Sequence, residues 1–514
     1  MSQQRFYNAV THLVDANVAA GRGGKPAFID PARRLTYAEL QDGTRRMVNV
    51  CDRLGIRAEE RAVMIMLDTV DFPVVFLGAI RAGVVPVPLN TLLTAEHYAY
   101  ILGDSKARVL FVSDALFPII EPVLATQKRL SQVVIVGGTR AGYPSLATLL
   151  AEASPEAETA HTSADEPAFW LYSSGSTGMP KGVKHVHSSL MATAETYGKQ
   201  VLGIRESDVC HSAAKLFFAY GLGNGLTFPL SVGATVILNP ERPVPAGVFH
   251  ILETHQPTIY FGVPTLYAAM LHDKALADAS GSSALRLCVS AGEALPEHVG
   301  NAWKQRFGVD ILDGVGSTEM LHIFLSNAPG DIRYGTSGRP VPGYEVRLVN
   351  EKGEDVADGD VGEMLVHGPS APEGYWNQRD KSRATFEGYW TRTGDKYTRD
   401  ADGRYTYCGR ADDMFKVSGI WVSPFEIESA LSGHPAVLEA AVVPGTDSDE
   451  LTKPKAYVVL KDGVNRAGLD EALKQHVKTV AGAWKYPRWI IFTDTLPKTA
   501  TGKIQRFKLR DLER

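Results

Sequence analysis

A short segment rich in glycine and hydroxyl groups is where this chain is first expected to do chemistry. Residues 172–182 read YSSGSTGMPKG and follow the apolar pair Trp170 and Leu171. Glycines permit unusual backbone dihedrals, N–H groups and hydroxyls donate hydrogen bonds, and Lys181 supplies a cation. These groups suit a loop that holds phosphate. The spacing is not that of a Walker motif, and Ser176 lacks the glycine two positions before it that a hydrolase elbow requires. A plain flexible loop is the alternative.

Further blocks follow in order along the chain. They are SAGEALP at 290–296, DGVGSTEM at 313–320, YGTSGRPVPGYEV at 334–346, YWTRTGD at 389–395, GRADDMFKVSGIWVSPFEIE at 409–428 and PKTATGK at 497–503. With the glycine-rich segment, they make nearly the whole chain resemble the adenylate-forming enzymes, which include acyl-CoA synthetases, luciferases and nonribosomal-peptide adenylation domains. The resemblance implies that ATP activates a carboxylic acid as an acyl-adenylate.

The resemblance also implies roles for particular residues. Thr318 and Glu319 match the pair beside Mg·ATP, since Mg²⁺ prefers hydroxyl and carboxylate oxygen. Lys503 matches the catalytic lysine that reaches the bond-making oxygens, where a mobile ammonium stabilises the transition state. Taken alone, Thr318 and Glu319 would begin a helix, Asp395 would be a turn residue and Lys503 a surface lysine. The implied ATP-binding residues are Ser173, Ser174, Gly175, Ser176, Thr177, Gly178, Lys181, Ser290, Ala291, Gly292, Glu293, Asp313, Gly314, Val315, Gly316, Ser317, Asp395 and Arg410.

Asp412 matches the family's hinge between a large and a small domain, although an acidic pair here would otherwise be a solvated turn. The resemblance implies two orientations of the small domain. One brings Lys503 to ATP, and the other brings a second face to coenzyme A. The residues of that face are Lys416, Ser418, Gly419 and Trp421. Gly419 would line a tunnel, where the missing Cβ lets the backbone pass close to the pantetheine arm.

Residues 213–229 and 316–327 resemble benzoate-CoA ligases and their hydroxybenzoate relatives. The implied aryl-acid pocket contains Ala219, Tyr220, Gly292, Gly314, His322 and Ile323. Apolar walls with a ring to stack on suit a flat aromatic acid. Tyr220 replaces the histidine common in the family. His322 either partners a ring hydroxyl or closes the pocket over an unsubstituted ring, and the sequence leaves both open.

The predicted function is therefore an ATP-dependent ligase that forms aryl-CoA from benzoate or a hydroxybenzoate through an aryl-adenylate, releasing AMP and pyrophosphate. The alternatives are loading of the acid onto a carrier-protein phosphopantetheine and a catalytically silent nucleotide-binding protein. The expected cofactors and substrates are ATP, Mg²⁺, CoA and a small-molecule aromatic acid. Acetylation of Lys503 by a protein acetyltransferase is a further hypothesis, and a homodimer is left open.

The elements that must position these residues can be read from the pattern. Strands are expected at 108–112, 132–136, 235–238, 258–263 and 285–289, alternating with amphipathic stretches, which is typical of layered α/β architecture. Residues 344–407 have the short strands and Gly/Asp turns of an antiparallel β subdomain. The prediction is a multi-layered α/β large domain, 1–411, whose sheets are covered by helices, and a small mobile α+β domain, 412–514.

Composition limits the partners. The 514 residues are 44% hydrophobic and carry a formal charge of −5, which gives no general field for nucleic acid. The start has no secretory pattern, and the apolar stretch 72–89 is broken by Arg81 and three prolines, so no membrane insertion is expected. The four cysteines are far apart, which favours free thiols in a reducing compartment and a cytoplasmic location.

Overall fold

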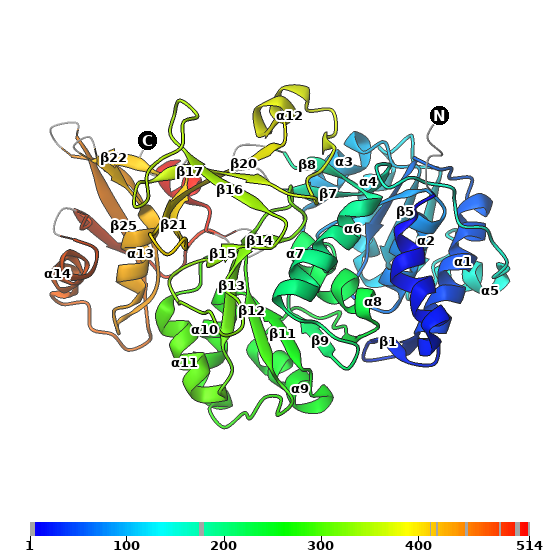
Figure 1. Cartoon of the computed structure of the whole chain (residues 1–514), viewed down its shortest axis with the longest axis horizontal. Helices are drawn as coiled ribbons and strands as arrows, with labels where there is room; N and C mark the ends of the chain where they lie inside the picture. The colour runs from blue at the N-terminus through cyan, green and yellow to red at the C-terminus, as the bar shows by residue number, and fades with distance from the viewer. Residues whose placement is uncertain are drawn as a thin grey trace.

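The computed structural model describes residues 6–173, 179–411, 413–417, 420–447, 451–482, 485–498 and 504–511. Figure 1 shows a large α/β part, built from the blue, cyan and green segments, and a small orange and red domain at the opposite end from the N-terminus. The yellow β subdomain lies between them. The predicted fold class, a multi-layered large domain followed by a smaller one, is confirmed. The boundary at Asp412 stays a prediction, because that residue lies outside the described ranges.

A nine-stranded sheet forms the centre of the large domain, in the order β15-β14-β13-β12-β11-β9-β10-β1-β2. The six strands from β13 to β1 run parallel, and β14, β15 and β2 are antiparallel to their neighbours. The strand bounds are Pro26–Ile29 (β1), Arg34–Thr36 (β2), Val209–Ser212 (β9), Thr235–Ile237 (β10), Ile259–Gly262 (β11), Leu287–Ser290 (β12), Ile311–Gly316 (β13), Ile323–Ser326 (β14) and Arg339–Pro340 (β15).

A second, four-stranded parallel sheet has the order β4-β3-β5-β6. Its strands are Arg61–Ile65 (β3), Val85–Pro88 (β4), Val109–Ser113 (β5) and Gln132–Val136 (β6). The apolar stretch 72–89 contains most of the buried helix α2, Asp71–Arg81, followed by β4. Arg81 is 1% exposed, and its cost of burial is offset because its guanidinium pairs with Asp15 at 2.7 Å.

Two smaller antiparallel sheets complete the large domain. The first contains Pro167–Ser173 (β7), Lys181–Val186 (β8) and Gly374–Tyr375 (β18). The second is the predicted β subdomain, made of Glu345–Val349 (β16), Gly362–His367 (β17), Phe386–Glu387 (β19), Trp390–Arg399 (β20) and Tyr405–Arg410 (β21). Because β18 crosses from the β subdomain to pair with β8, two distant stretches of sequence meet at the glycine-rich segment.

The first of the helices that cover these sheets begins with a conventional sequence signal. Thr36 caps α1 through a capping box, in which Thr36 Oγ1 accepts from the N–H of Glu39 and the Glu39 carboxylate accepts from that of Thr36. The other helices of the large domain are α2, given above, and Ala95–Asp104 (α3), Phe117–Leu124 (α4), Leu146–Glu152 (α5), His187–Thr193 (α6), Ala219–Leu222 (α7), Phe228–Val232 (α8), Pro245–His255 (α9), Pro264–His272 (α10), Glu297–Phe307 (α11) and Arg379–Thr385 (α12); α1 itself is Tyr37–Arg53. Shorter π and 3₁₀ segments are Thr11–Asp15 (η1), Val18–Arg22 (η2), Asp114–Leu116 (η3), Ala194–Val201 (η4), Gly223–Thr227 (η5) and Lys274–Leu276 (η6).

The small domain has its own core. The buried apolar side chains from Phe415 to Leu509 form two clusters made only of residues after position 413. Its elements are Phe415–Val417 (β22), Ile420–Val422 (β23), Pro424–Ser432 (α13), Val437–Thr446 (β24), Thr452–Leu460 (β25), Leu469–Ala481 (α14), Trp489–Phe492 (β26) and Arg506–Asp511 (α15). A separate core is what allows a domain to behave as one body.

No helix in the described ranges combines the length and the apolar character needed to cross a bilayer. All four cysteines are free thiols, with Cys51, Cys210 and Cys288 buried and Cys408 half-buried.

An ion-pair network inside the small domain gives a stability prediction. Arg506 makes two hydrogen bonds to the Glu428 carboxylate, at 2.9 and 2.6 Å, and a longer one to Asp413. Arg506→Leu leaves the buried Glu428 carboxylate without this partner, so we expect the opening free energy of β24 and β25 to fall by about 3–5 kcal/mol. Hydrogen–deuterium exchange of the backbone amides of β24 and β25 measures this opening free energy.

The matched control is Arg347→Leu, which breaks a more exposed pair with Asp355. Its effect on the opening free energy of β16 should stay below about 1 kcal/mol. If Arg506→Leu costs no more than Arg347→Leu, the network does not hold the small domain together.

Candidate active site

The glycine-rich segment joins two paired strands. Ser173 at the end of β7 lies opposite Lys181 at the start of β8, and Tyr172 lies opposite Gly182. The hairpin therefore places a hydroxyl and an ammonium at the base of the predicted phosphate loop. Ser174, Gly175, Ser176, Thr177 and Gly178, which would form its tip, lie outside the described residues, so their predicted role is not tested here.

Thr318 and Glu319 lie in the turn between β13 and β14, next to this hairpin. The Oε1 atom of Glu319 accepts a hydrogen bond from the Tyr375 hydroxyl at 2.8 Å and one from Ser173 at 3.3 Å. The predicted phosphate segment and the predicted metal-binding carboxylate are thus in contact. The two residues of this contact are 146 positions apart in the chain.

A buried histidine makes a hydrogen bond to this turn. His185 on β8 stacks on Phe169 and donates from Nε2 to the Thr318 carbonyl at 2.9 Å. Burial lowers the pKa of His185 to about 4, against the raising effect of that hydrogen bond, so the ring is neutral at pH 7. Lys184 and His185 belong to β8, and His187 begins α6.

Positive charge gathers around Lys181. Burial lowers the pKa of its ammonium, the Glu319 carboxylate opposes that effect, and the nearby cations Lys381 and Arg410 lower it further. Burial and repulsion among cations both favour the arrival of an anion. The negative charge of a polyphosphate would stabilise the buried ammonium and reduce the repulsion among the cations. Lys381 belongs to α12 and was not among the residues predicted from sequence.

Asp395 and Arg410, the predicted ribose-binding pair, are neighbours across β20 and β21. Arg410 Nη1 lies 3.2 Å from Asp395 Oδ1 and also donates to the Thr393 carbonyl at 3.0 Å. The side chain of Asp395 is 17% exposed and that of Arg410 is 42% exposed. A partly exposed carboxylate that is fixed by a guanidinium can accept hydrogen bonds from a diol.

The two segments predicted to enclose adenine are brought side by side in the central sheet. Ser290 at the end of β12 pairs in register with Asp313 on β13. Burial raises the pKa of Asp313 well above its ordinary value. Its Oδ1 and the Ser290 hydroxyl are buried and have no hydrogen-bond partner among the described residues. Buried polar atoms are normally paired, so these two atoms mark a place where a polar ligand fits. Ala291, Glu293, Val315 and Ser317 continue the same two segments.

The predicted aryl-acid pocket is assembled from α7 and the start of β14. The rings of Tyr220 and His322 lie 5.5 Å apart, and Ile323 packs where a Cβ on Gly314 would meet it at 2.9 Å. A Cβ on Gly316 would meet the His322 carbonyl oxygen at 2.5 Å. Only glycine therefore lets the end of β13 lie this close to the backbone of His322. Ala219 begins α7, and Gly292, with a φ of +96°, has open space where a Cβ would project.

The protonation of His322 can be deduced from its neighbours. Its Nε2 lies 3.2 Å from the Tyr220 carbonyl and 3.1 Å from Asn224 Oδ1. Since the carbonyl can only accept, Nε2 carries the hydrogen. Burial lowers the pKa of His322 to about 3, so the ring is neutral and its buried Nδ1 is an acceptor without a partner in the described part of the chain.

The remaining predicted residues are only partly described. Asp412, Ser418, Gly419 and Lys503 lie outside the described residues. The backbones of Lys416 and Trp421 pair with one another across β22 and β23. The predictions of a hinge, a CoA face and a catalytic lysine therefore remain predictions.

The described residues fit the coordination habits of Mg²⁺. No cluster of three or more His, Cys, Asp or Glu side chains that could hold a metal occurs among them. Mg²⁺ usually takes one or two protein oxygens and completes its shell with water and phosphate. Thr318 and Glu319, beside a phosphate-type loop, supply such oxygens.

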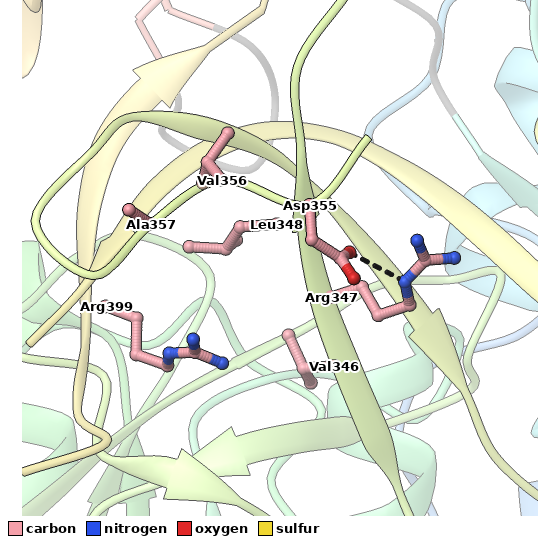
Figure 2. A pocket seen from close by; sticks show the side chains of 7 residues that line it. All are labelled: Val346, Arg347, Leu348, Asp355, Val356, Ala357 and Arg399. Carbon is pink, nitrogen blue, oxygen red and sulfur yellow. Dashed lines mark hydrogen bonds and ion pairs between the residues drawn. The ribbon is translucent and has the colours of Figure 1, made fainter. Parts of the chain in front are cut away.

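A cavity of about 110 Å³ elsewhere in the β subdomain does not belong to this site. Figure 2 shows that Val346, Leu348, Val356 and Ala357 line it together with two arginines. Arg347 pairs with Asp355 at 2.8 Å, and Arg399 pairs with Asp358 at 2.6 Å. Because both guanidiniums are already paired, this cavity suits an anion poorly.

Four residues of the site were missed from sequence: Tyr375, Asn224, His185 and Lys381. Asn224 is the polar member of an otherwise apolar run four positions after Tyr220, a pattern that could have indicated a buried role. Tyr375 and Lys381 gave no comparable signal, because their contacts depend on how β18 and α12 return to the hairpin.

Comparison with known proteins agrees with this geometry. The chain matches the family described as AMP-binding enzyme over residues 15–376, and that described as AMP-binding enzyme C-terminal domain over residues 426–503. It is 57% identical to a 4-hydroxybenzoate–CoA/benzoate–CoA ligase from Rhodopseudomonas palustris, covering 99% of this chain and 94% of that protein.

Two further proteins are similar over the full length. A benzoate–CoA ligase from Thauera aromatica is 57% identical, covering 98% of this chain and 96% of that protein. The crystal structure of a benzoate CoA ligase from Burkholderia xenovorans superposes with a TM-score of 0.91 at 51% identity, covering 98% of this chain and 100% of that one.

The buried histidines give a prediction about pH. Unfolding restores a pKa of about 6.5 to a histidine such as His322, so between pH 6.5 and 4 the unfolded chain binds a proton that the folded chain does not. Stability therefore falls as the pH is lowered, by at most about 1.4 kcal/mol per pH unit for each such histidine. We expect His322→Gln to weaken this dependence when urea midpoints are compared from pH 7 to 4.5.

The control is His250→Gln, which changes an exposed histidine. Burial raises the pKa of Asp68 to about 6, so this residue makes the protein more stable as the pH is lowered, opposite to the histidines. The pH dependence of each variant is therefore compared with that of the wild type, and the wild-type profile is not interpreted alone. Equal pH slopes for wild type and His322→Gln would contradict the neutral buried ring.

Proposed function

This chain belongs to the AMP-binding enzyme family, and we propose that it joins an aromatic carboxylic acid to CoA through an acyl-adenylate, releasing AMP and pyrophosphate. The observation that carries the proposal is the contact of Glu319 with the phosphate hairpin, on the same β13–β14 unit that begins the aryl pocket at His322. The full-length similarity to benzoate–CoA and hydroxybenzoate–CoA ligases supports the same reaction.

In the first step the aryl carboxylate attacks the α-phosphorus of ATP. The new bond joins carboxylate oxygen to phosphorus, and the bond to the β,γ-pyrophosphate breaks with its electrons leaving on pyrophosphate. Ser173 and Lys181 hold the phosphates, Asp395 holds the ribose, and the aryl ring lies against Tyr220 and Ile323. Positioning and local charge therefore supply most of the catalysis.

In the second step the CoA thiolate attacks the acyl carbon. A carbon–sulfur bond forms, the bond from the acyl carbon to the AMP oxygen breaks, and the thiol proton passes to solvent. We infer that the small domain turns about Asp412 between the steps, so that Lys503 leaves and the strands β22 and β23 approach.

Mg²⁺, when bound, neutralises charge on the phosphates, and Thr318 and Glu319 are the residues that would hold it. The His185 hydrogen bond to the Thr318 carbonyl fixes the backbone of that turn. Because His185 is buried and neutral, it adds no second charge beside the phosphates.

We propose benzoate or a hydroxybenzoate as the acid. Nδ1 of His322 is an acceptor, which favours a ring substituent that donates, such as a hydroxyl, while the apolar walls accept an unsubstituted ring. Transfer to a carrier-protein phosphopantetheine is the second candidate, and a direct comparison of free CoA with a carrier protein as acceptor separates the two. The free thiols favour a cytoplasmic location.

Lys503→Ala tests the mechanism by separating the half-reactions. Loss of the ammonium should lower benzoate-dependent pyrophosphate release by roughly 10²- to 10³-fold, while thioester formation from supplied benzoyl-AMP stays near the wild-type rate. Acetylation of Lys503 by a protein acetyltransferase would remove the same charge and have the same selective effect.

The matched control is Lys478→Ala, which removes an ammonium from α14 of the same domain. It should leave both half-reactions unchanged. An equal loss of both half-reactions in Lys503→Ala would contradict the role assigned to Lys503, and a wild-type enzyme without benzoate-dependent pyrophosphate release would contradict the proposed function.

Asn224→Leu tests the polar end of the pocket. The change removes the acceptor next to His322 Nε2 at similar volume, so the ring loses an orienting hydrogen bond worth about 1–1.5 kcal/mol. We expect KM for hydroxybenzoate to rise roughly fivefold to tenfold, KM for benzoate to rise less, and KM for ATP to stay constant. Initial rates over a panel of benzoate, hydroxybenzoates, aminobenzoate, furoate and a fatty acid measure this.

The control for this substitution is Asn301→Leu on the exposed face of α11. It should change none of these constants. Parallel changes of KM for benzoate and hydroxybenzoate in Asn224→Leu would show that Asn224 only packs the pocket.

A further inference from the structure

Tyr375 lies at the meeting point of the phosphate hairpin, the Thr318–Glu319 turn and α12. It is 6% exposed, and its backbone pairs with Val183 of β8. Its N–H donates to Ser382 Oγ at 3.0 Å, and its ring packs on Phe386 at 5.1 Å. Backbone and ring are thus both fixed by neighbours that belong to none of the predicted motifs.

The hydroxyl of Tyr375 makes a hydrogen bond to the Glu319 carboxylate. It donates to Oε1 at 2.8 Å, and Ser173 approaches the same oxygen at 3.3 Å. Because an ionised carboxylate can only accept, the phenol is the donor in this hydrogen bond. Among the described residues the hydrogen bonds to this carboxylate fall on Oε1, so the other oxygen, Oε2, is the one presented to a cation.

The ring of Tyr375 contacts the ammonium group of Lys181. The Lys181 Nζ lies 4.4 Å from the ring centroid, within the range of a cation–π contact. The ring face thereby holds the ammonium at the base of the hairpin while leaving its N–H groups available. One side chain thus orients a carboxylate with its hydroxyl and an ammonium with its ring.

We propose that Tyr375 is a positioning residue that aims the Glu319 carboxylate at the divalent cation of Mg·ATP and, separately, aims the Lys181 ammonium at the phosphates. The inference rests on the proposed function for the identity of the bound nucleotide. It goes beyond that function by assigning two separable tasks to a residue outside the motifs. Partners that orient metal ligands in this way commonly change metal affinity when they are removed.

Tyr375→Phe tests the first task, because it deletes only the hydroxyl. We expect the Mg²⁺ concentration that half-saturates pyrophosphate release to rise roughly 10-fold, within the 10- to 100-fold range known for such partners. Binding of Mn²⁺ to the enzyme–ATP complex, followed by electron paramagnetic resonance, should weaken by a similar factor. ATP binding without divalent cation should not change, since the ring still holds Lys181.

Tyr375→Leu tests the second task, because it deletes the ring as well. ATP binding in the absence of divalent cation, measured by calorimetry, should weaken by roughly 2- to 5-fold relative to Tyr375→Phe, as expected for loss of a cation–π contact. Equal metal-free ATP affinities in the two variants would overturn the role given to the ring.

Controls separate positioning from loss of structure. Tyr389→Phe and Tyr389→Leu make the same changes at a tyrosine that is 83% exposed in the same β subdomain, and they should change neither Mg²⁺ dependence nor ATP binding. In a Glu319→Ala background, Tyr375→Phe should have no further effect on Mn²⁺ affinity, because the residue that it orients is gone. An unchanged Mn²⁺ affinity in Tyr375→Phe alone would overturn the role given to the hydroxyl.

Failure of the role given to Tyr375 can be distinguished from failure of the proposed function. If the wild-type chain shows no pyrophosphate release with any aromatic acid, the choice of substrate is wrong, but Mn²⁺ and ATP binding still report on Tyr375. If release is normal while the binding constants of Tyr375→Phe and Tyr375→Leu match wild type, the proposed function stands and the role of Tyr375 fails.

Discussion

The contact between the Glu319 carboxylate and the Tyr375 hydroxyl is the interaction on which the arrangement of the site depends. Without a ligand, the cations Lys181, Lys381 and Arg410 repel one another in a partly desolvated place, and Glu319 is the nearby anion that opposes this repulsion. A carboxylate left free to turn toward Lys181 would form an ion pair and compete with phosphate. Fixing Oε1 with a phenol keeps carboxylate and ammonium close but separately oriented, which suits a site that must accept a metal and a polyphosphate together.

The same β-hairpin unit links this charged region to the neutral aryl pocket. β13 carries Asp313, which is predicted to contact the nucleotide, the turn after it carries Thr318 and Glu319, and β14 begins with Ile323. The turn includes Leu321 at a φ of +63°, a conformation uncommon for residues other than glycine. A short unit therefore links the predicted metal ligand Glu319 to the predicted aryl pocket, and burial keeps His322 neutral, so that under the proposed function no charge competes for the carboxylate of the substrate.

Local sequence predicted the elements well and the contacts between them less well. The strands near 132–136 and 235–238 and the antiparallel β subdomain were found because alternation, apolar runs and turn residues are local signals. Asp395 and Arg410 were predicted by resemblance and are paired across two strands. Tyr375 and His185 could not be predicted, because nothing near them in sequence indicates that they contact Glu319 and Thr318, 56 and 133 positions away.

In the small domain, ion pairs tie the helix that follows the predicted catalytic lysine, Lys503, to the start of the domain. Arg506, three positions after Lys503, binds Glu428 of α13 and Asp413, the residue after the predicted hinge, and Arg510 binds Asp413 as well. These partly buried pairs join the start of the domain to its end, so a rotation at the predicted hinge would carry α15 with it. Against the large domain, Tyr407 of β21 packs on Phe425 of α13 at the edge of this network. A domain whose charges are paired internally leaves few unpaired groups when its contacts with the large domain change, which would lower the cost of the proposed alternation between two orientations.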